Sequence, residues 1–385
     1  MLNENKEREL AYIVVVDNVE PIDGYDKIAY ATVGGWHCVV GADMKAGDKA
    51  IYFEIDSLLP STDQRFAFCE KYHYKVKTQK YCKGSRISQG LLLPITEFPE
   101  FVDAEVGTFV TKQLGVTYYD PMDRARKSKG ESTPQYKNWF KRWSKRFPFK
   151  QLLSTRIGRK VLFPIFTVKK KKRVWPDFIP KTDEERINNC CYVLNDKTPY
   201  EVSEKVDGSS SSYGIRRGKH GKYEYYVCSR NVVFPSADQT SYYAKNIWWE
   251  MYEKYNIKDF LTDFLEKTGA EWVYLQGETF GDGVQKRDYS IKCRDFRAFV
   301  LCTSQRVRYS YAETKEILDQ YNIPTVPIID TNFILPDTAD ELITYAAGPS
   351  AIDGLPREGI VLRSVNDPTK SFKAVDPAYL LRFHG

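Results

Sequence analysis

The sequence predicts an α+β protein in which a small N-terminal β-barrel precedes a larger domain of mixed helices and antiparallel strands. A chain of 385 residues is long enough for two or three domains. Its first part contains short strand-like runs separated by turns, whereas helical and strand-like patterns are mixed towards its end. We therefore predict a barrel at 1–115, a basic connector at 116–173 and an α+β domain at 174–385.

The barrel is predicted from five strand-like runs, which lie at 11–16, 27–33, 36–40, 49–54 and 86–93. Turn-forming pairs such as Asp23-Gly24 and Gly34-Gly35 separate them. Five short strands within about a hundred residues fit an OB-like barrel, a fold that commonly binds nucleic acid. An SH3-like barrel would produce a similar pattern, so both barrels stay open at this point.

The connector is predicted from its charge. Between Arg124 and Arg173 there are eighteen Lys or Arg residues and one acid, Glu131, so this segment carries +17 although the whole chain carries +6. Such a basic band is typical of proteins that bind a phosphate backbone, although a solvated linker is the alternative. Interleaved aromatic residues are compatible with a short helix at 136–147.

Composition indicates a cytoplasmic protein without a membrane span. No apolar stretch approaches the ~18 residues that a span needs, and the charged N-terminus is unlike a secretory signal. The eight cysteines show no regular spacing, which favours reduced thiols, and Cys69, His73 and Cys82 form only a minor zinc candidate. The cluster Lys169–Arg173 makes a nuclear location the alternative.

The α+β domain is predicted from capping boxes and strand-like runs. Thr182–Glu185, Ser310–Glu313 and Thr338–Glu341 each have the pattern that opens a helix. A longer helix is expected over Ser241–Lys267, with an interruption near Asn256. The strand-like runs between these helices are 212–215, 223–228, 272–276, 298–302 and 359–363.

The chemistry is predicted to centre on Lys205-Val206-Asp207-Gly208, which follows a strand-like run. A lysine that attacks phosphorus needs a neutral amine in an exposed turn with space for a nucleotide. Such a reaction also needs cations at the α-phosphate, a carboxylate for a metal, a polar ribose contact and an aromatic ring for the base. The same domain offers Arg230 and Lys373, Glu358, Glu278, and Phe299 or Phe296 in these roles.

These motifs, in this order, resemble the covalent nucleotidyltransferases: ATP-dependent DNA and RNA ligases and mRNA-capping guanylyltransferases. The resemblance covers about residues 175–380 and rests on Lys205–Gly208, Ser229-Arg230-Asn231, Gly277-Glu278, Phe299, Glu358–Val361 and Phe372-Lys373. A barrel ahead of the transferase domain is similar to RNA ligases with an N-terminal OB domain and a C-terminal ligase domain. The family's last motif has two lysines one residue apart; here Ser371 occupies the first place, directly after Lys370.

The resemblance implies an ATP-grasp-like ligase domain and assigns a role to each site residue. Lys205 is the nucleophile, Glu358 contacts Mg²⁺ or Mn²⁺, and the nucleotide is bound by Glu204, Asp207, Gly208, Arg230, Glu278, Phe299, Lys370 and Lys373. The implied activity is ATP-dependent joining of RNA 3′-OH and 5′-phosphate ends by a monomer. A GTP-using capping enzyme, a DNA ligase and a non-catalytic RNA-binding protein are the alternatives.

Overall fold

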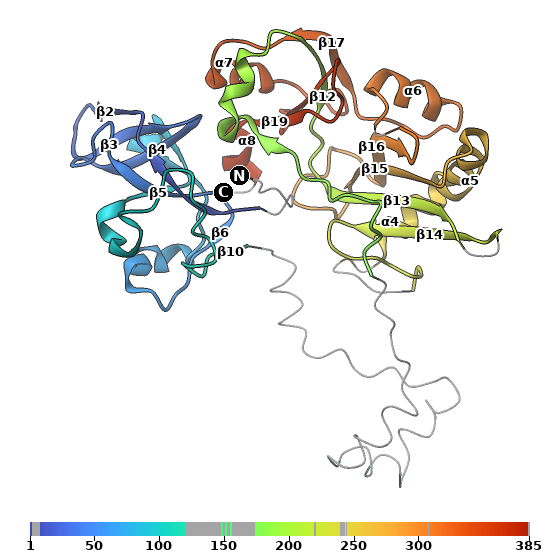
Figure 1. Ribbon diagram of the computed structural model, residues 1–385, viewed down its shortest axis with the longest axis horizontal. Helices are drawn as coiled ribbons and strands as arrows, with labels where there is room; N and C mark the ends of the chain where they lie inside the picture. Colours follow the sequence, from blue (N-terminus) through green and yellow to red (C-terminus); the bar gives the residue numbers. More distant parts are fainter. Residues whose placement is uncertain are drawn as a thin grey trace. The chain divides into compact units, whose positions relative to one another are not determined.

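The computed structural model describes residues 1, 8–119, 148, 151, 155, 174–218, 221–238, 243, 245–306 and 308–383 (Figure 1). Residues 1–119 and 176–385 form one compact unit, and residues 120–175 form another. The helix expected at 136–147, most of the basic band and the cluster Lys169–Arg173 lie outside the described residues. The domain limits at 115 and 173 stay a prediction.

The N-terminal part of the first unit is a small β-barrel, as expected from its strand-like runs (Figure 1). Its strands pair antiparallel in the orders β1-β5-β9, β2-β3-β4, β6-β10 and β7-β8. The bounds are β1 (Ala11–Val15), β2 (Asn18–Ile22), β3 (Tyr25–Val33), β4 (Trp36–Gly41), β5 (Lys49–Phe53), β6 (Ser57–Leu58), β7 (Thr78–Tyr81), β8 (Arg86–Gln89), β9 (Leu91–Pro94) and β10 (Thr117–Tyr118).

Apolar side chains fill the barrel on both sides of β1 and β5. Ile13, Ile51 and Phe53 belong to one buried cluster, and Tyr12 and Tyr52 belong to another. The run expected as one strand at 86–93 is two strands, because Gly90 has a φ of 101°. A Cβ there would lie 2.6 Å from the Tyr52 hydroxyl oxygen, so a side chain does not fit at this break.

The C-terminal part contains two β-sheets, and every strand pair except β11–β19 is antiparallel. The five-stranded sheet has the order β11 (Glu185–Arg186), β19 (Ser371–Val375), β18 (Gly359–Ser364), β12 (Pro199–Glu204), β17 (Ile328–Ile334). The four-stranded sheet has the order β14 (Tyr223–Ser229), β13 (Ser209–Arg217), β15 (Trp272–Gly281), β16 (Arg294–Thr303). This architecture confirms the predicted α+β fold with antiparallel sheets.

Five α-helices are described: α4 (Ile247–Lys254), α5 (Ile257–Thr268), α6 (Tyr311–Asp319), α7 (Ala339–Ala346) and α8 (Pro377–Phe383). Helices α4 and α5 pack on the four-stranded sheet, and α7 packs on β18 and β19 of the other sheet (Figure 1). The described 3-10 helices are η1 (Gln64–Tyr72), η2 (Cys82–Gly84), η3 (Ile95–Glu97), η4 (Pro99–Phe101), η5 (Ile187–Asn189) and η6 (Cys191–Asn195).

Two of the three predicted capping boxes open helices. Ser310 and Thr338 cap α6 and α7 in full capping boxes. The break expected near Asn256 is confirmed, since this residue separates α4 from α5 with a φ of 47°. The helix expected after Thr182 is wrong. Its hydroxyl bonds to the Ser210 hydroxyl, and the chain continues into the short strand β11.

The barrel and the C-terminal part are joined by a polar network around Asn189, at the end of η5. The Asn189 side-chain oxygen accepts hydrogen bonds from Trp36 Nε1 at 2.6 Å and from the Tyr12 hydroxyl at 3.0 Å. Its amide nitrogen donates to Glu54 and to Glu185, both at 2.7 Å. All four hydrogen-bonding positions of this amide are therefore occupied, three of them by barrel side chains and the fourth by Glu185.

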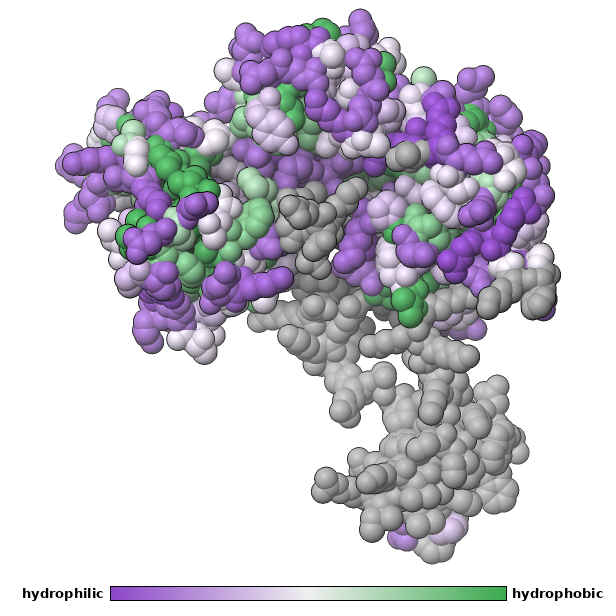
Figure 2. Space-filling model, viewed as in Figure 1, coloured by the Kyte–Doolittle hydropathy of each residue, from purple (hydrophilic) through white to green (hydrophobic). Residues whose placement is uncertain are grey.

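The surface, the helices and the cysteines were compared with the predictions made from composition. Hydrophilic residues dominate the described part of the face shown in Figure 2. None of the described helices is long and apolar enough to cross a membrane. The eight cysteines, all within the described ranges, form no disulfide, and no group of three or more His, Cys, Asp or Glu side chains among the described residues is placed to hold a metal.

Candidate active site

The predicted nucleophile lies in residues 205–208, which join the two sheets of the C-terminal part and are named the nucleophile loop. Lys205 directly follows β12 of the five-stranded sheet, and β13 of the other sheet begins at Ser209. The Lys205 N–H donates to Gly359 O at 3.0 Å. Gly208 faces the backbone of the other sheet, where a Cβ would lie 2.4 Å from Thr279 O. The loop is therefore held between β18 and β15, and glycine is required where it meets β15.

Lys205 forms an ion pair with Glu358, the residue directly before β18. The distance from Lys205 Nζ to Glu358 Oε2 is 2.5 Å, and the two side chains are 24% and 10% exposed. Burial lowers the pKa of Lys205, but the carboxylates of Glu358, Asp207 and Glu278 raise it by more, so that it lies above its usual value. The site thus brings the predicted nucleophile and the predicted metal ligand into direct contact.

Glu278, in the middle of β15, adds a further carboxyl group to this site. Burial, together with the nearby carboxylates of Glu358 and Asp207, raises the pKa of Glu278 to about 8, although Lys205 and Arg230 act in the opposite direction. Three carboxyl groups, those of Glu358, Asp207 and Glu278, thus lie around the single lysine Lys205. A perturbed carboxyl group of this kind, next to a candidate nucleophile, is typical of a functional site.

The two predicted phosphate-binding cations meet on one carboxylate, Asp183. Lys373 Nζ, on β19, donates to Asp183 Oδ1 at 3.0 Å, and Arg230 Nη2, directly after β14, donates to Asp183 Oδ2 at 2.6 Å. Burial raises the pKa of Asp183, but the charges of Lys373, Arg230 and Arg8 lower it well below its usual value. The structure therefore brings together two cations that lie 143 positions apart, 230 and 373, as the prediction requires.

The barrel contributes an aromatic ring and a cation next to this cluster. Tyr118, on β10, has the guanidinium carbons of Arg8 and of Arg230 at 5.6 Å each from its ring centroid. Arg8 Nε also donates to Glu54 Oε2 at 3.1 Å. Sequence reasoning missed Asp183, Arg8 and Tyr118 as members of the site, because their proximity depends on how the barrel and the two sheets pack.

Asp207 is fixed by two tyrosines that the sequence did not identify. The Asp207 N–H donates to the Tyr289 hydroxyl at 2.6 Å, and the Tyr379 hydroxyl of α8 donates to Asp207 Oδ2 at 2.9 Å. Arg287 lies beside both rings, at 4.2 Å and 5.7 Å from the centroids of Tyr289 and Tyr379. Arg287 also pairs with Asp353 at 2.7 Å, and both side chains are only 3% exposed. This buried pair supports the tyrosines that hold the nucleophile loop.

Two predicted nucleotide ligands have other contacts in the structure. Glu204 is 2% exposed, and its carboxylate accepts from the Ser350 hydroxyl and from the Ala351 N–H at 2.8 Å. It thus anchors the loop before β18. Lys370 pairs with Asp196 at the protein surface. Direct nucleotide contacts by Glu204 and Lys370 stay a prediction.

The structure distinguishes the two aromatic residues considered for base stacking. Phe296 is fully buried and packs edge-on against Tyr213, at 5.4 Å between ring centroids. Phe299, three residues further along β16, is partly exposed and packs in the same apolar cluster as Val206 of the nucleophile loop. Phe299 is therefore the better candidate for the stacking ring.

The carboxylates fit a divalent metal that is shared with a phosphate substrate. Mg²⁺ is usually held by one or two carboxylates together with substrate phosphates, rather than by an all-protein cage. The described residues contain no three-ligand cluster, whereas the Glu358 carboxylate and the Glu278 carboxyl group both lie beside Lys205. Glu358, with Glu278 nearby, would hold such an ion.

Comparisons with known proteins agree with the predicted fold and domains. Residues 198–375 match the family model of RNA ligases, and residues 10–95 match a model of an OB-fold domain. No curated protein sequence matches the chain. A structure of Naegleria gruberi RNA ligase with PPi is 26% identical, with 98% of this chain and 99% of that chain covered and a TM-score of 0.74.

Mutants of the same Naegleria gruberi enzyme give similar matches. One with ATP and Mn is 27% identical, with 98% of each chain covered and a TM-score of 0.73. Another with AMP and Mn is 26% identical, with 97% of this chain and 99% of that chain covered and a TM-score of 0.74. The chain therefore contains an RNA ligase domain, with an OB-fold domain ahead of it, and its fold is similar to that of the Naegleria gruberi RNA ligase over nearly the whole chain.

Proposed function

We propose that this RNA ligase joins RNA 3′-OH and 5′-phosphate ends through a lysyl-AMP intermediate on Lys205. The observation that carries the proposal is the contact of Lys205 with Glu358, beside the cations Lys373 and Arg230. The structures of the related Naegleria gruberi enzyme with ATP and Mn, and with AMP and Mn, support ATP as the nucleotide substrate and a divalent metal as the cofactor here.

The first step would be attack of the neutral Lys205 amine on the α-phosphorus of ATP. A P–N bond forms, the bond to the bridging oxygen of the β-phosphate breaks, and pyrophosphate leaves; the amine loses its proton to solvent. Lys373 and Arg230 would stabilise the charge that develops on the phosphate oxygens, which is the largest contribution that a protein makes to phosphoryl transfer. A metal at Glu358 would neutralise part of the same charge.

Two further transfers would complete the reaction. An oxygen of the RNA 5′-phosphate attacks the α-phosphorus of the lysyl-AMP, the P–N bond breaks and Lys205 regains a proton. The RNA 3′-hydroxyl then attacks the 5′-phosphate of the adenylated end, and AMP leaves as the new phosphodiester forms. For these steps the protein positions the reacting groups; Lys205 is the one residue that bonds covalently to the nucleotide.

Asp183 and Phe299 would set how ATP is bound. Asp183 holds Lys373 and Arg230 at a common position, so that both cations are presented to the phosphates together. Phe299 would stack on the adenine, and Glu278 would accept from the ribose hydroxyls. We further propose that the enzyme acts as a monomer in the cytoplasm.

A sealing panel tests the proposal. Nicked duplexes with RNA or DNA on each side of the nick would be incubated with ATP or GTP and a divalent metal. We expect ATP-dependent joining of ends that carry RNA, loss of joining in Lys205→Met, and full activity in the control Lys222→Met, a substitution at an exposed hairpin residue. Joining that requires GTP instead of ATP contradicts the proposal, and so does equal sealing of all-DNA nicks, which would indicate a DNA ligase.

A further inference from the structure

The OB-fold domain carries a segment of one charge sign, which we name the basic hairpin: residues 71–86, comprising the end of η1, β7 and the turn into β8. It contains no Asp or Glu, and three tyrosines are interleaved with its cations. Basic residues interleaved with aromatic residues are typical of nucleic-acid contact surfaces. The six cations are Lys71, Lys75, Lys77, Lys80, Lys83 and Arg86.

One edge of the basic hairpin is anchored to the barrel, and its tip is exposed. The Ser88 hydroxyl accepts from the Val39 N–H at 3.0 Å, and Gln89 O accepts from the Tyr52 hydroxyl at 2.9 Å. These bonds fix β8 against β4 and β5. Lys80, on β7, and Lys83, in the turn, are both exposed. The barrel thus presents these two ammonium groups to solvent from a fixed support.

The tip has an unusual backbone that keeps Lys83 at this position. Cys82, Lys83 and Gly84 have successive positive φ values of 51°, 56° and 95°. A non-glycine residue in this conformation costs on the order of 1 kcal/mol, and such residues gather at ligand-binding sites. Within the turn, the Ser85 N–H and the Ser85 hydroxyl both donate to Cys82 O, at 3.2 Å and 2.9 Å, which closes the tip around Lys83.

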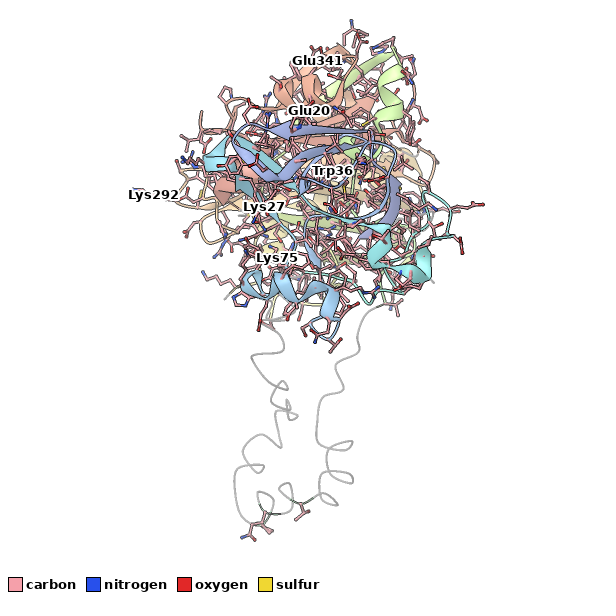
Figure 3. The ribbon with its side chains drawn as sticks, turned by 90° about the vertical axis from the view of Figure 1, so that its left-hand side faces the viewer. Glu20, Lys27, Trp36, Lys75, Lys292 and Glu341 are labelled. Atoms are coloured by element: carbon pink, nitrogen blue, oxygen red, sulfur yellow. The ribbon has the colours of Figure 1, made fainter. Side chains whose placement is uncertain are left out.

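The charge of the basic hairpin is largely unneutralised by neighbours. Among the described residues, Lys75 is the one cation of the six with a carboxylate partner, Asp56 at 3.5 Å. Acidic residues of the barrel lie outside the basic hairpin, with Asp17, Glu20, Asp23 and Asp26 in and around β2 and β3. Figure 3 shows Glu20 and Lys75 well apart on the barrel.

The basic hairpin leads to the candidate active site. Strand β7 packs against α8, the helix whose Tyr379 bonds to Asp207 of the nucleophile loop. Lys75 Nζ lies 4.3 Å from the ring centroid of Tyr119, and the adjacent Tyr118 contacts Arg230. Cations and aromatic rings thus extend from the exposed tip to the phosphate-binding cations.

We propose that the basic hairpin binds the phosphate backbone of RNA next to the break and holds the 5′-phosphate end near Lys205. The proposal rests on the proposed function and names the protein surface that its RNA substrate contacts. Phosphate contacts position a nucleic acid without reading its sequence, which suits an enzyme that acts on ends and breaks. The exposed lysines at the tip contact the backbone, and Lys75 continues this contact towards the site.

The test compares two double charge reversals in the full chain. Lys80→Glu with Lys83→Glu changes the basic hairpin; Lys27→Glu with Lys45→Glu changes two exposed lysines elsewhere on the barrel and is the matched control. Binding of a nicked RNA duplex is measured across salt concentrations by fluorescence anisotropy. Self-adenylylation and the KM and kcat of sealing are measured in parallel, and circular dichroism verifies that each variant is folded.

We expect the hairpin variant to bind the duplex at least about tenfold more weakly at low salt, with a salt dependence shallower by about two contacts. Its self-adenylylation should match wild type, and its KM for RNA should rise while kcat changes little. Equal binding by the hairpin and control variants overturns the proposal. Absence of adenylylation in wild type would instead contradict the proposed function, because the binding comparison requires no catalysis.

Discussion

Lys205 Nζ and Glu358 Oε2 lie 2.5 Å apart, although the two residues are separated by 153 positions in the sequence. This contact joins the loop after β12 to the start of β18. It places the amine that would attack ATP against the carboxylate that would hold the metal. The same contact raises the pKa of Lys205 and so favours the protonated amine. The amine must lose this proton before it can react.

Glu358→Gln should slow self-adenylylation and alter its pH dependence. Only the neutral amine attacks, so the wild-type rate should rise with pH while Lys205 loses its proton. Removal of the Glu358 charge lowers the pKa of Lys205, which shifts the rise to lower pH. Loss of the metal contact should reduce the rate by about a hundredfold. Single-turnover labelling between about pH 6 and pH 9 measures both effects.

The control for this experiment is Glu316→Gln, at an exposed position on α6. It should leave the rate and the pH profile unchanged. A slow Glu358→Gln enzyme with the wild-type pH profile would contradict the electrostatic link between these two residues, even if the carboxylate is needed for another reason.

Glu278→Gln should stabilise the protein at alkaline pH. The folded-state pKa of Glu278, about 8, lies above its unfolded value. Between these values the folded state binds one more proton than the unfolded state, so stability falls as pH rises through this window. Glutamine has no proton to lose, and the variant should melt above wild type near pH 8 and close to it near pH 4. Thermal unfolding at the two pH values measures this, and a constant difference would contradict it.

Arg287→Met should destabilise the protein and weaken the support of the nucleophile loop. It leaves the carboxylate of Asp353 buried at 3% exposure without its partner, which typically costs about 3–5 kcal/mol. The double variant Arg287→Met with Asp353→Leu should recover part of this stability. Denaturant unfolding of both single variants and the double variant forms the cycle. Additive losses would show that the pair is not coupled.

Phe299→Ala and Phe296→Ala should have different effects. Phe299 is partly exposed beside the nucleophile loop, so its loss should raise the KM for ATP with a modest change in stability. Phe296 is fully buried, so its truncation should cost about 3–5 kcal/mol through cavity formation. ATP titration and thermal unfolding of both variants distinguish these outcomes. A larger KM effect in Phe296→Ala would contradict the assignment of the stacking ring.

Several elements were predictable because their signals are local. The capping boxes at Ser310 and Thr338 and the helix interruption near Asn256 depend on nearby residues, and these predictions were correct. The box at Thr182 failed because its members are used by distant parts of the chain. Asp183 binds Lys373 and Arg230, and Glu184 accepts from Ser371. These tertiary contacts favour an extended chain over a helix.

The supporting residues of the site were not predictable for the same reason. Tyr289, Tyr379 and Arg287 have no motif of their own, and they act by packing around Asp207. The order of the motifs in the sequence predicted which groups carry the chemistry. Only the fold shows which groups hold them, because that information lies in contacts between α8, the loop after β15 and the nucleophile loop.

The central claim is that Lys205 becomes covalently attached to AMP. The most direct measurement is mass spectrometry of the full chain after incubation with ATP and a divalent metal, followed by peptide mapping. The account predicts an added AMP on the peptide that contains Lys205, stable to alkali but released by acid as a phosphoramidate is, and absent in Lys205→Met. AMP on a different residue, or an unmodified protein that nevertheless seals RNA, would contradict it.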